Sequence, residues 1–441
     1  MKRRNIHYAW LILVSCCVMQ GVGIGIISNC AGIYYTPICE ELGFSMGQLT
    51  FYKTLSGIFS ILSLSMAPLL FKKLDVRVFA FGLIAVAGGV NFAMAFGTKL
   101  WHWYLIGILQ GCTLTCFSHF LPVTLINNWF SERVGFAMGI SCAASGGVGM
   151  VMSHLLGGIV QNYGWRASAM ANGIVCVALT APFALFVIRK SPKEMGMEAF
   201  GAERLEVHAK EKAGTDADCR AAGPTGKVPE ARGGNGGGDI APNRLPVSCF
   251  LMVVVFSVCA KATVGFAQYL TGYGDSVAAL AGTGSMLLTL YLFGNMCFKF
   301  FFGYTNDRLG VFKSTCLELA VLLTGCFLLL SHQGGGMAWG AVLFGTCAML
   351  SNVQSPLLVR TLWDKEHFAK AYARMAMIAD ASYYISITLF GFVYDFTGKY
   401  EPVLMICMAG ICLEAVLICG LFGPGRRREA LRVRRSGSVG E

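Results

Sequence analysis

Apolar stretches long enough to cross a bilayer constrain this chain more than any other feature. A helix needs about 20 residues to span the hydrocarbon core. Of the 441 residues, 55% are hydrophobic and only 13% are charged. This composition has too few polar residues to cover a soluble globular protein, and it is too apolar for a disordered chain. The sequence therefore predicts an all-α membrane protein with twelve transmembrane helices, near residues 8–36, 49–70, 78–97, 101–126, 135–160, 167–188, 247–270, 279–302, 314–331, 337–361, 372–394 and 402–423.

The predicted helices fall into two groups of six. Residues 189–246 between them are rich in Gly and mixed charge, include GGNGGG at 233–238, and cannot build a core. We therefore expect an N-terminal six-helix bundle, a flexible cytoplasmic linker, a C-terminal six-helix bundle and a basic cytoplasmic tail, over residues 1–188, 189–246, 247–423 and 424–441.

Basic residues indicate the orientation of these helices. With the N-terminus in the cytoplasm, cytoplasmic segments hold 29 of the 35 Lys and Arg, and four fall at outer ends: Lys53, Lys99, Arg166 and Lys399. The first stretch is too long for the apolar core of a signal peptide. We expect a multi-pass protein of the cell (inner) membrane with both termini cytoplasmic, and the formal charge of +11 requires no nucleic-acid partner.

An internal repeat relates the two groups. Adding 234 to positions in the fourth and fifth helices reaches the same residue type in the tenth and eleventh, at Gly111/Gly345, Pro122/Pro356, Trp129/Trp363, Gly157/Gly391 and Gly164/Gly398. Two pseudo-symmetric bundles are typical of transporters, with the binding site between them near mid-membrane. The two prolines permit helix bends, which are either static kinks or parts of a gate.

The sequence does not favour an enzyme. It has no Ser/His/Asp set, no phosphate-binding Gly loop and no Cys/His spacing suited to zinc, so neither a metal nor another cofactor is expected. The 18 cysteines lie mostly in apolar runs, where we interpret them as small packing residues.

Several motifs resemble those of the major facilitator superfamily, and within it the branch of oxalate/formate antiporters and monocarboxylate transporters. They are His7-Tyr8-Ala9-Trp10, Trp129-Phe130 with Arg133, Gly164-Trp165-Arg166, and Gly303-Tyr-Thr-Asn-Asp307-Arg308-Leu-Gly310. The resemblance implies the major facilitator fold and transport by alternating access. It also implies that Asp307 and Arg308 form a cytoplasmic latch, with Arg133 and the degenerate first-half loop at Asp75 as further gating positions; a helix cap and topology charges are the alternative.

Three ionisable residues inside predicted spans stand out as candidates: Lys261, Lys299 and Asp380. An ionisable group in hydrocarbon costs about 2.5–3.5 kcal/mol, so each calls for a partner or a task. In the oxalate transporters that the chain resembles, bases on the eighth and eleventh helices hold the carboxylates; Lys299 occupies the first position and Asp380 falls near the second with reversed charge. Asn295 stands where monocarboxylate transporters carry an acid.

Charge balance favours a monoanion over a dianion, which Asp380 would repel unless Lys261 also reached the site. Asp380 would take up a proton and free Lys299 to bind the carboxylate, so Asp380 is the predicted proton-coupling residue. A zwitterionic amino acid fits as well, and a permanent Lys299–Asp380 salt bridge, or a snorkelling or structurally paired Lys261, is the structural alternative. Further candidates for lining the site are polar residues on inward helices: Gln20, Asn29, His119, Asn352 and Gln354.

The leading hypothesis is a secondary active transporter of a small organic anion, coupled to a proton or a counter-anion, in a lipid bilayer. An exporter of amphipathic compounds is the alternative within transporters, because Met and Phe are abundant in the helices. A sensor that keeps the fold without transporting is less consistent, since residues 189–246 resemble no signalling domain.

Overall fold

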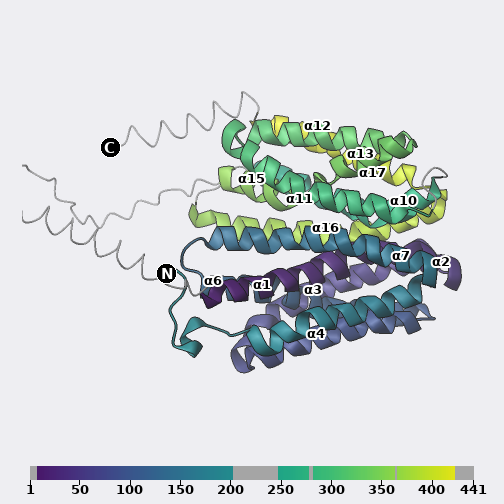
Figure 1. Cartoon of the computed structure of the whole chain (residues 1–441). Helices are drawn as coiled ribbons and strands as arrows, with labels where there is room; N and C mark the ends of the chain where they lie inside the picture. The colour runs from purple at the N-terminus through teal and green to yellow at the C-terminus, as the bar shows by residue number, and fades with distance from the viewer. Residues whose placement is uncertain (1–6, 202–246, 278–281, 363–364, 423–441) are drawn as a thin grey trace, which may run out of the picture.

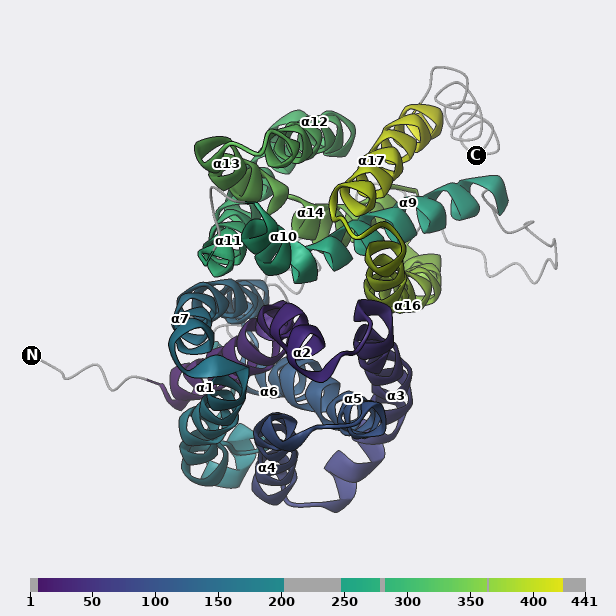
Figure 2. The same ribbon diagram turned by 90° about the vertical axis from the view of Figure 1, so that its right-hand side faces the viewer.

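Two side-by-side bundles of helices form the computed structural model, which describes residues 7–201, 247–277, 282–362 and 365–422. The first bundle contains the N-terminal helices and the second the C-terminal ones, with roughly parallel axes (Figure 1), and the view along the axes separates them clearly (Figure 2). In the described part, eleven segments are long and apolar enough to cross a membrane. The longest, Val134–Val187, counts as two spans because Gly164 breaks it at φ 80°, so the twelve predicted spans are confirmed.

Helix bounds in the first bundle follow the predicted spans closely. Its helical elements are α1 (Tyr8–Gln20), a π-helical turn (Gly21–Ser28), a 3₁₀ turn (Asn29–Tyr34), α2 (Tyr35–Leu42), α3 (Met46–Lys73), α4 (Val76–Ala93), α5 (Leu100–Thr115), the π-helical turn η4 (Cys116–Phe120), α6 (Leu121–Trp129), α7 (Val134–Pro182) and a π-helical turn (Phe183–Val187). The first span reaches Leu42, beyond the predicted end at 36, because its last turns are irregular but still helical.

The second bundle repeats this order. Its helical elements are α9 (Val247–Gly265), α10 (Leu270–Ser276), α11 (Gly284–Leu309), α12 (Val311–Leu330), α13 (Gly334–Phe344), α14 (Cys347–Met349), the π-helical turn η9 (Leu350–Gln354), α15 (Ser355–Leu362), α16 (Lys365–Thr397) and α17 (Glu401–Phe422). Short 3₁₀ turns complete the two bundles within the described residues.

The sequence repeat corresponds to repeated local geometry. A Cβ on Gly111 would lie 2.3 Å from the backbone oxygen of Ser56 in α3, and a Cβ on Gly345 would lie 2.4 Å from the backbone nitrogen of Asn295 in α11. Because these two glycines have no side chain, the backbone of the fourth helix of each bundle can contact the backbone of the second helix directly. The same helix pair is close-packed in each bundle for the same reason.

The bends and breaks of the repeat also match. Pro122 and Pro356 each follow a π-helical turn, η4 and η9 respectively. A π-helical turn before a proline leaves backbone groups outside the regular helical pattern and turns side chains to new directions. Gly164 and Gly398 both adopt left-handed backbone angles, at φ 80° and 67°. Trp363, the predicted counterpart of Trp129, lies outside the described residues.

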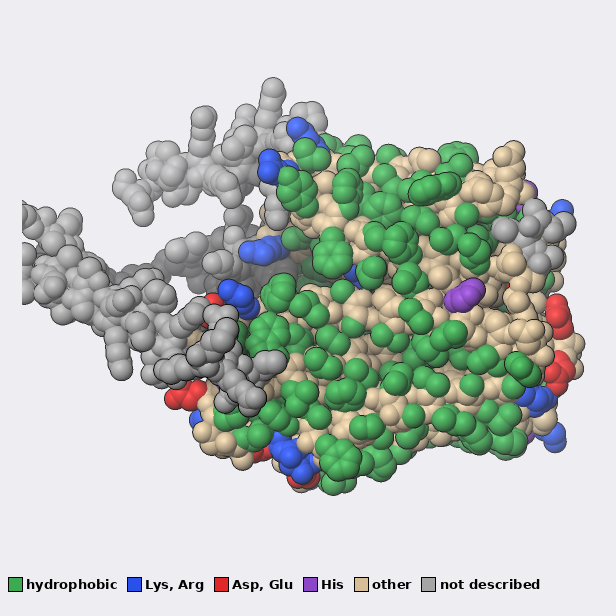
Figure 3. All heavy atoms as spheres, in the orientation of Figure 1, with side chains coloured by type: hydrophobic (Ala, Val, Ile, Leu, Met, Phe, Trp, Pro, Cys, Tyr) green, Lys and Arg blue, Asp and Glu red, His purple; other side chains and the backbone are tan. Residues whose placement is uncertain are grey.

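Apolar side chains cover the middle of the molecule, and charged ones gather towards its two ends (Figure 3). Many large apolar side chains of the helices are exposed, including Phe300 and Phe186 at 68% and 74%. A soluble protein does not expose so much apolar surface, whereas a bilayer covers such a belt. We call the end where α1 and α9 begin the terminal face, and the end at α2 and α10 the opposite face.

Two antiparallel helix pairs join the bundles, and the first is α3 with α16. Asp395 of α16 accepts hydrogen bonds from the backbone N–H groups of Met46 and Gly47 at 2.7 and 2.8 Å, which caps the beginning of α3. The hydroxyls of Thr54 and Thr388 lie 2.7 Å apart about two turns deeper. These contacts lie in the half of the helices nearer the opposite face.

The second joining pair is α7 with α11. Ser153 and Thr289 share a hydrogen bond of 2.7 Å, and a Cβ on Gly157 would lie 2.4 Å from Ser285. Nearer the terminal face the same helices carry Gly139 and Gly303, and nothing lies within 4 Å of a Cβ added to either of them. The bundles are therefore joined towards the opposite face and separate towards the terminal face.

The predicted linker is not entirely solvated at its beginning. Phe200 packs edge-on against Trp10, and its backbone N–H donates to the oxygen of Trp129 at 2.9 Å. The Trp129 indole donates to the oxygen of Arg189 at the same distance. Apolar contact thus holds residues 189–201 against the first bundle, whereas residues 202–246 and the tail from 423 lie outside the described residues.

Candidate functional site

The polar centre of the molecule is an ion pair between Lys261 of α9 and Asp380 of α16. Lys261 Nζ lies 2.8 Å from Asp380 Oδ1, and the side chains are 20% and 53% exposed. Lys261 Nζ also donates to Asn352 Oδ1 at 3.1 Å. Asn352 belongs to η9, so the π-helical turn before Pro356 places this amide beside the lysine. Three helices of the second bundle therefore converge on one ammonium group.

His119 of the first bundle faces this ion pair. It lies in η4, the counterpart of η9, and its side chain is exposed in the helical body. His119 is within electrostatic range of both Asp380 and Lys261, although it belongs to the other bundle. The candidate site is thus shared by the two bundles, with one π-helical turn from each.

The charged residues lie where the two bundles begin to separate. On α16, Asp380 is one turn beyond Tyr384, whose ring fills the space beside Gly57 of α3. On α11, Lys299 is one turn beyond Met296, which lies beside Gly146 and Gly147 of α7. Each charge therefore follows the last glycine-mediated contact of its helix pair, on the side of the terminal face.

The structure does not pair Lys299 with Asp380. α16 packs against α9 and α3, whereas α11 packs against α7 and α13, so Asp380 meets the lysine of α9 instead. Lys299 has no hydrogen bond or ion pair within the described residues, and Cys142 of α7 lies within electrostatic range of it. The alternative of a permanent Lys299–Asp380 salt bridge is therefore wrong, while a structurally paired Lys261 matches the ion pair that is observed.

The other predicted binding residues occupy several environments. Gln354 donates to Glu318 and Asn306, and makes no hydrogen bond to Lys261. Asn295 is buried where α11 meets the Gly345 turn, and Gln20 is buried in α1; the side-chain oxygen of each has no hydrogen-bond partner. Asn29 is half-buried at the beginning of its 3₁₀ turn. Their part in binding stays a prediction.

The predicted gating residues lie at the terminal face. Asp75 caps α4 by accepting from the Arg77 N–H at 2.8 Å, as the alternative interpretation expected of a loop acid. Arg133 precedes α7 in a left-handed conformation at φ 61°, with Glu132 at 3.8 Å. The Arg308 guanidinium lies 5.2 Å from the centre of the Tyr304 ring, and the Asp307 side chain lies outside the described residues. A gating role for these residues stays a prediction.

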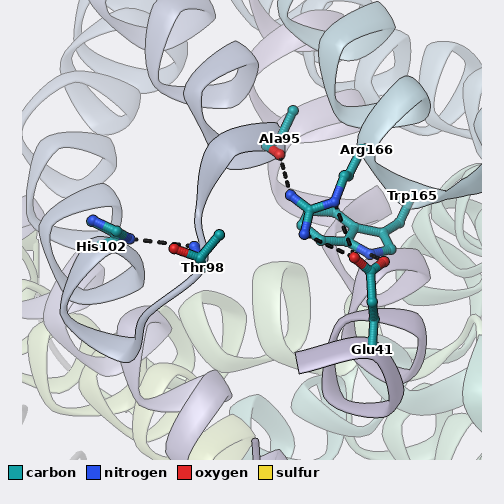
Figure 4. Close-up of polar contacts among 6 residues, drawn as sticks. All are labelled: Glu41, Ala95, Thr98, His102, Trp165 and Arg166. Carbon is teal, nitrogen blue, oxygen red and sulfur yellow. Dashed lines mark hydrogen bonds and ion pairs between the residues drawn. The ribbon is translucent and has the colours of Figure 1, made fainter. Parts of the chain in front are cut away.

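A polar cluster at the opposite face explains one of the motifs. Glu41 accepts hydrogen bonds from Arg166 at 2.8 Å and from the Trp165 indole at 2.5 Å, and the Arg166 guanidinium also donates to the Ala95 oxygen at 2.6 Å (Figure 4). The break at Gly164 directs these two side chains towards α2. Sequence reasoning singled out the Gly-Trp-Arg motif but missed its partner Glu41.

Sequence reasoning also missed three buried ionisable residues inside spans. Glu318 in α12 and Glu414 in α17 are fully buried, and Lys53 in α3 is 4% exposed instead of lying at an outer end. The cost of an ionisable group in hydrocarbon singled out Lys261, and the same rule applied to every span would have found these residues.

Comparison with known proteins agrees with this architecture. The family model described as Major Facilitator Superfamily matches residues 11–285. Monocarboxylate transporter 12 of Rattus norvegicus is 21% identical over 438 residues, covering 93% of this chain and 85% of the relative. The probable transporter MCH2 of Saccharomyces cerevisiae is 31% identical over 179 residues, covering 39% of this chain and 37% of the relative.

Solved structures show the same fold. The nucleoside transporter NupG superposes with a TM-score of 0.68 at 10% identity, covering 94% of this chain and 98% of that one. The xylose transporter XylE from E. coli, in a partially occluded inward open conformation, gives 0.63 at 13% identity, covering 95% and 100%. The expected family resemblance and fold are therefore confirmed, and this multi-pass membrane protein belongs to the Major Facilitator Superfamily of transporters.

Proposed function

We propose that the protein is a secondary active carrier of a small organic anion of the monocarboxylate type, coupled to a proton. The observation that carries this proposal is the Lys261 ammonium held between Asp380 and Asn352 at the point where the bundles separate. The names of two relatives, monocarboxylate transporter 12 of Rattus norvegicus and monocarboxylate transporter 14 of Homo sapiens, support the substrate class.

Charge neutrality explains the coupling. In the empty carrier, ionised Asp380 neutralises Lys261. When Asp380 takes up a proton, Lys261 is free to bind the substrate carboxylate, and the site is neutral again. A carrier that held the anion without the proton would have a net negative charge, which is costly to enclose between the bundles. Only the empty and the doubly loaded carrier therefore change conformation readily.

Neighbouring residues complete the proposed site. Asn352 would keep Lys261 in place when Asp380 releases it, and His119 would contact the substrate from the first bundle. Lys299 lies towards the open side and would attract the anion before it reaches Lys261. We propose that the terminal face is cytoplasmic, as the distribution of basic residues predicts, and that the protein lies in the cell membrane.

The test is uptake into proteoliposomes of radiolabelled monocarboxylates, dicarboxylates and neutral amino acids, with and without a pH gradient. We expect Lys261→Gln to abolish monocarboxylate uptake. Asp380→Asn should keep exchange at equal pH but lose the acceleration by a gradient, because the amide cannot release a proton. Glu40→Gln, at an exposed position, is the control. Unchanged uptake by Lys261→Gln would overturn the binding site, and gradient-driven uptake by Asp380→Asn would overturn the coupling.

A zwitterionic amino acid is the second candidate. The opposite charges of Lys261 and Asp380, 2.8 Å apart and both partly exposed, also match a carboxylate and an ammonium group on one molecule. In this case Asp380→Asn should abolish amino-acid uptake itself, at equal pH as well as with a gradient. The same two variants therefore distinguish the candidates.

A further inference from the structure

A second buried acid lies outside the site described above. Glu318 of α12 is fully buried, and its Oε1 accepts a hydrogen bond from Gln354 Nε2 at 2.7 Å. Gln354 Nε2 also donates to Asn306 Oδ1 at 3.0 Å. Three helices of the second bundle therefore bring one carboxyl and two amides into a single cluster.

Each of the three side chains in this cluster has one unsatisfied polar atom. Glu318 Oε2, Gln354 Oε1 and Asn306 Nδ2 are buried and have no hydrogen-bond partner. Buried polar atoms nearly always have a hydrogen-bond partner. Three unpaired atoms in one cluster therefore indicate a site whose hydrogen bonds change in another protonation state. The cluster has donors and acceptors for a carboxyl group in either protonation state.

We propose that Glu318, Gln354 and Asn306 form a proton-binding site separate from the Lys261–Asp380 pair. With Glu318 ionised, the Gln354 amide donates to it, as observed. With Glu318 protonated, both amides turn over, so that Asn306 and the Glu318 hydroxyl each donate to the Gln354 oxygen across the same two distances. Amide orientation follows the hydrogen-bond network, so the proton enters with little movement of heavy atoms. One proton comes from water, and no other bond changes.

Within the described residues, no neighbouring charge neutralises Glu318, so protonation is the way in which it becomes neutral. The elements packed against α12 are α11, α13, α17 and η9. Within the described residues, the ionisable groups of these elements form no ion pair with Glu318. They are Tyr291, Cys297, Lys299, Tyr304 and Arg308 on α11, and Glu401, Cys407, Cys412, Glu414 and Cys419 on α17, while α13 and η9 carry none and the Asp307 side chain of α11 lies outside the described residues. Lys313, Cys316 and Cys326 share α12 with Glu318 and do not pair with it either. An enclosed carboxylate without a countercharge is costly, and protonation removes that cost.

The position of the cluster gives it access and a route to the binding site. Asn306 lies one turn before α11 ends at Leu309, close to the terminal face from which a proton can enter. Gln354 shares the turn η9 with Asn352, which bonds Lys261. Its role in the transport cycle rests on the carrier function proposed above, whereas proton binding itself does not.

Infrared difference spectroscopy of the purified protein between acidic and neutral pH tests the proposal. The C=O stretch of a protonated carboxyl should appear on acidification and lose one component in Glu318→Gln. Glu414→Gln is the matched control, because Glu414 is an equally buried acid in the same bundle but both of its oxygens lack any partner. Glu414 therefore has no network to hold the charged form, and its substitution should leave the pH-dependent band unchanged.

A second variant covers the case in which Glu318→Gln does not fold. Gln354→Met removes the hydrogen-bond donor of Glu318, so the protonated band should persist to higher pH. A pH-dependent band that is the same in wild type and in Glu318→Gln would overturn the proposal, as would a band that Gln354→Met leaves unmoved. If Asp380→Asn keeps its gradient response while the Glu318 band behaves as expected, the proposed function fails and this inference stands.

Discussion

Gly157 offers a sharp test of how the two bundles are joined. A Cβ at this position would lie 2.4 Å from both the Cβ and Oγ of Ser285 in α11, closer than real Cβ atoms approach other atoms. A leucine there must therefore push α7 and α11 apart towards the opposite face. Overpacking of this kind costs about 1–3 kcal/mol. If the clash exists only in the conformation described here, Gly157→Leu should reduce its population relative to the alternative about 5- to 150-fold.

The native Cys142 provides the readout for this change. Its side chain is exposed on α7, close to Lys299, where the bundles separate towards the terminal face. A water-soluble maleimide should label Cys142 readily in the wild type and more slowly in Gly157→Leu, since the alternative conformation closes that side. Labelling of Cys142→Ser gives the background from all other cysteines, of which Cys412 and Cys419 are exposed within the described part of the chain.

Gly158→Leu is the matched control. It makes the same substitution one residue along the same helix, but nothing lies within 4 Å of a Cβ at this position. We expect wild-type labelling of Cys142 in this variant. Equal labelling of folded Gly157→Leu and Gly158→Leu would refute the reasoning, because the contact with Ser285 would then have no influence on the choice between conformations.

Three further predictions follow from contacts described above. Asp395→Asn removes the charged cap of α3, which should weaken the opposite-face contact by about 1 kcal/mol and slow Cys142 labelling. Arg166→Lys loses the planar guanidinium that binds Glu41 and should lower the melting temperature in detergent. Substitution of a polar residue outside this cluster should leave the melting temperature unchanged. Gly345→Leu should prevent accumulation of folded protein, because its Cβ would meet backbone of α11, whereas Gly335→Leu, where nothing lies within 4 Å, should fold normally in size-exclusion chromatography.

Much of the scaffold could be predicted from local sequence. The predicted spans agree with the helices to within a few residues in most cases, because length and hydropathy of a 20-residue window decide whether a helix can cross a bilayer. The offset of 234 residues also located the close helix contacts at Gly111 and Gly345 and the breaks at Gly164 and Gly398. These are properties of backbone shape, which glycine and proline encode at their own positions.

The pairing of the charges could not be predicted in the same way. Lys261, Lys299 and Asp380 were identified from the cost of an ionisable group in hydrocarbon, but this cost does not tell which of them face each other. The answer depends on the neighbours and rotation of each helix, and Asp380 meets Lys261 because α16 packs against α9. The environments of Gln354 and Glu318 were decided in the same manner.

By itself, the sequence determined that the chain crosses a membrane twelve times in two related bundles and that a few ionisable residues are buried there. Only the tertiary structure decided that Lys261 is the partner of Asp380, that Glu318 meets two amides, and that the bundles separate towards the terminal face. The physical reason is the sequence range over which each property is determined. Membrane insertion sums over neighbouring residues in one helix, whereas a hydrogen bond or an ion pair requires side chains from different helices to meet within about 3 Å.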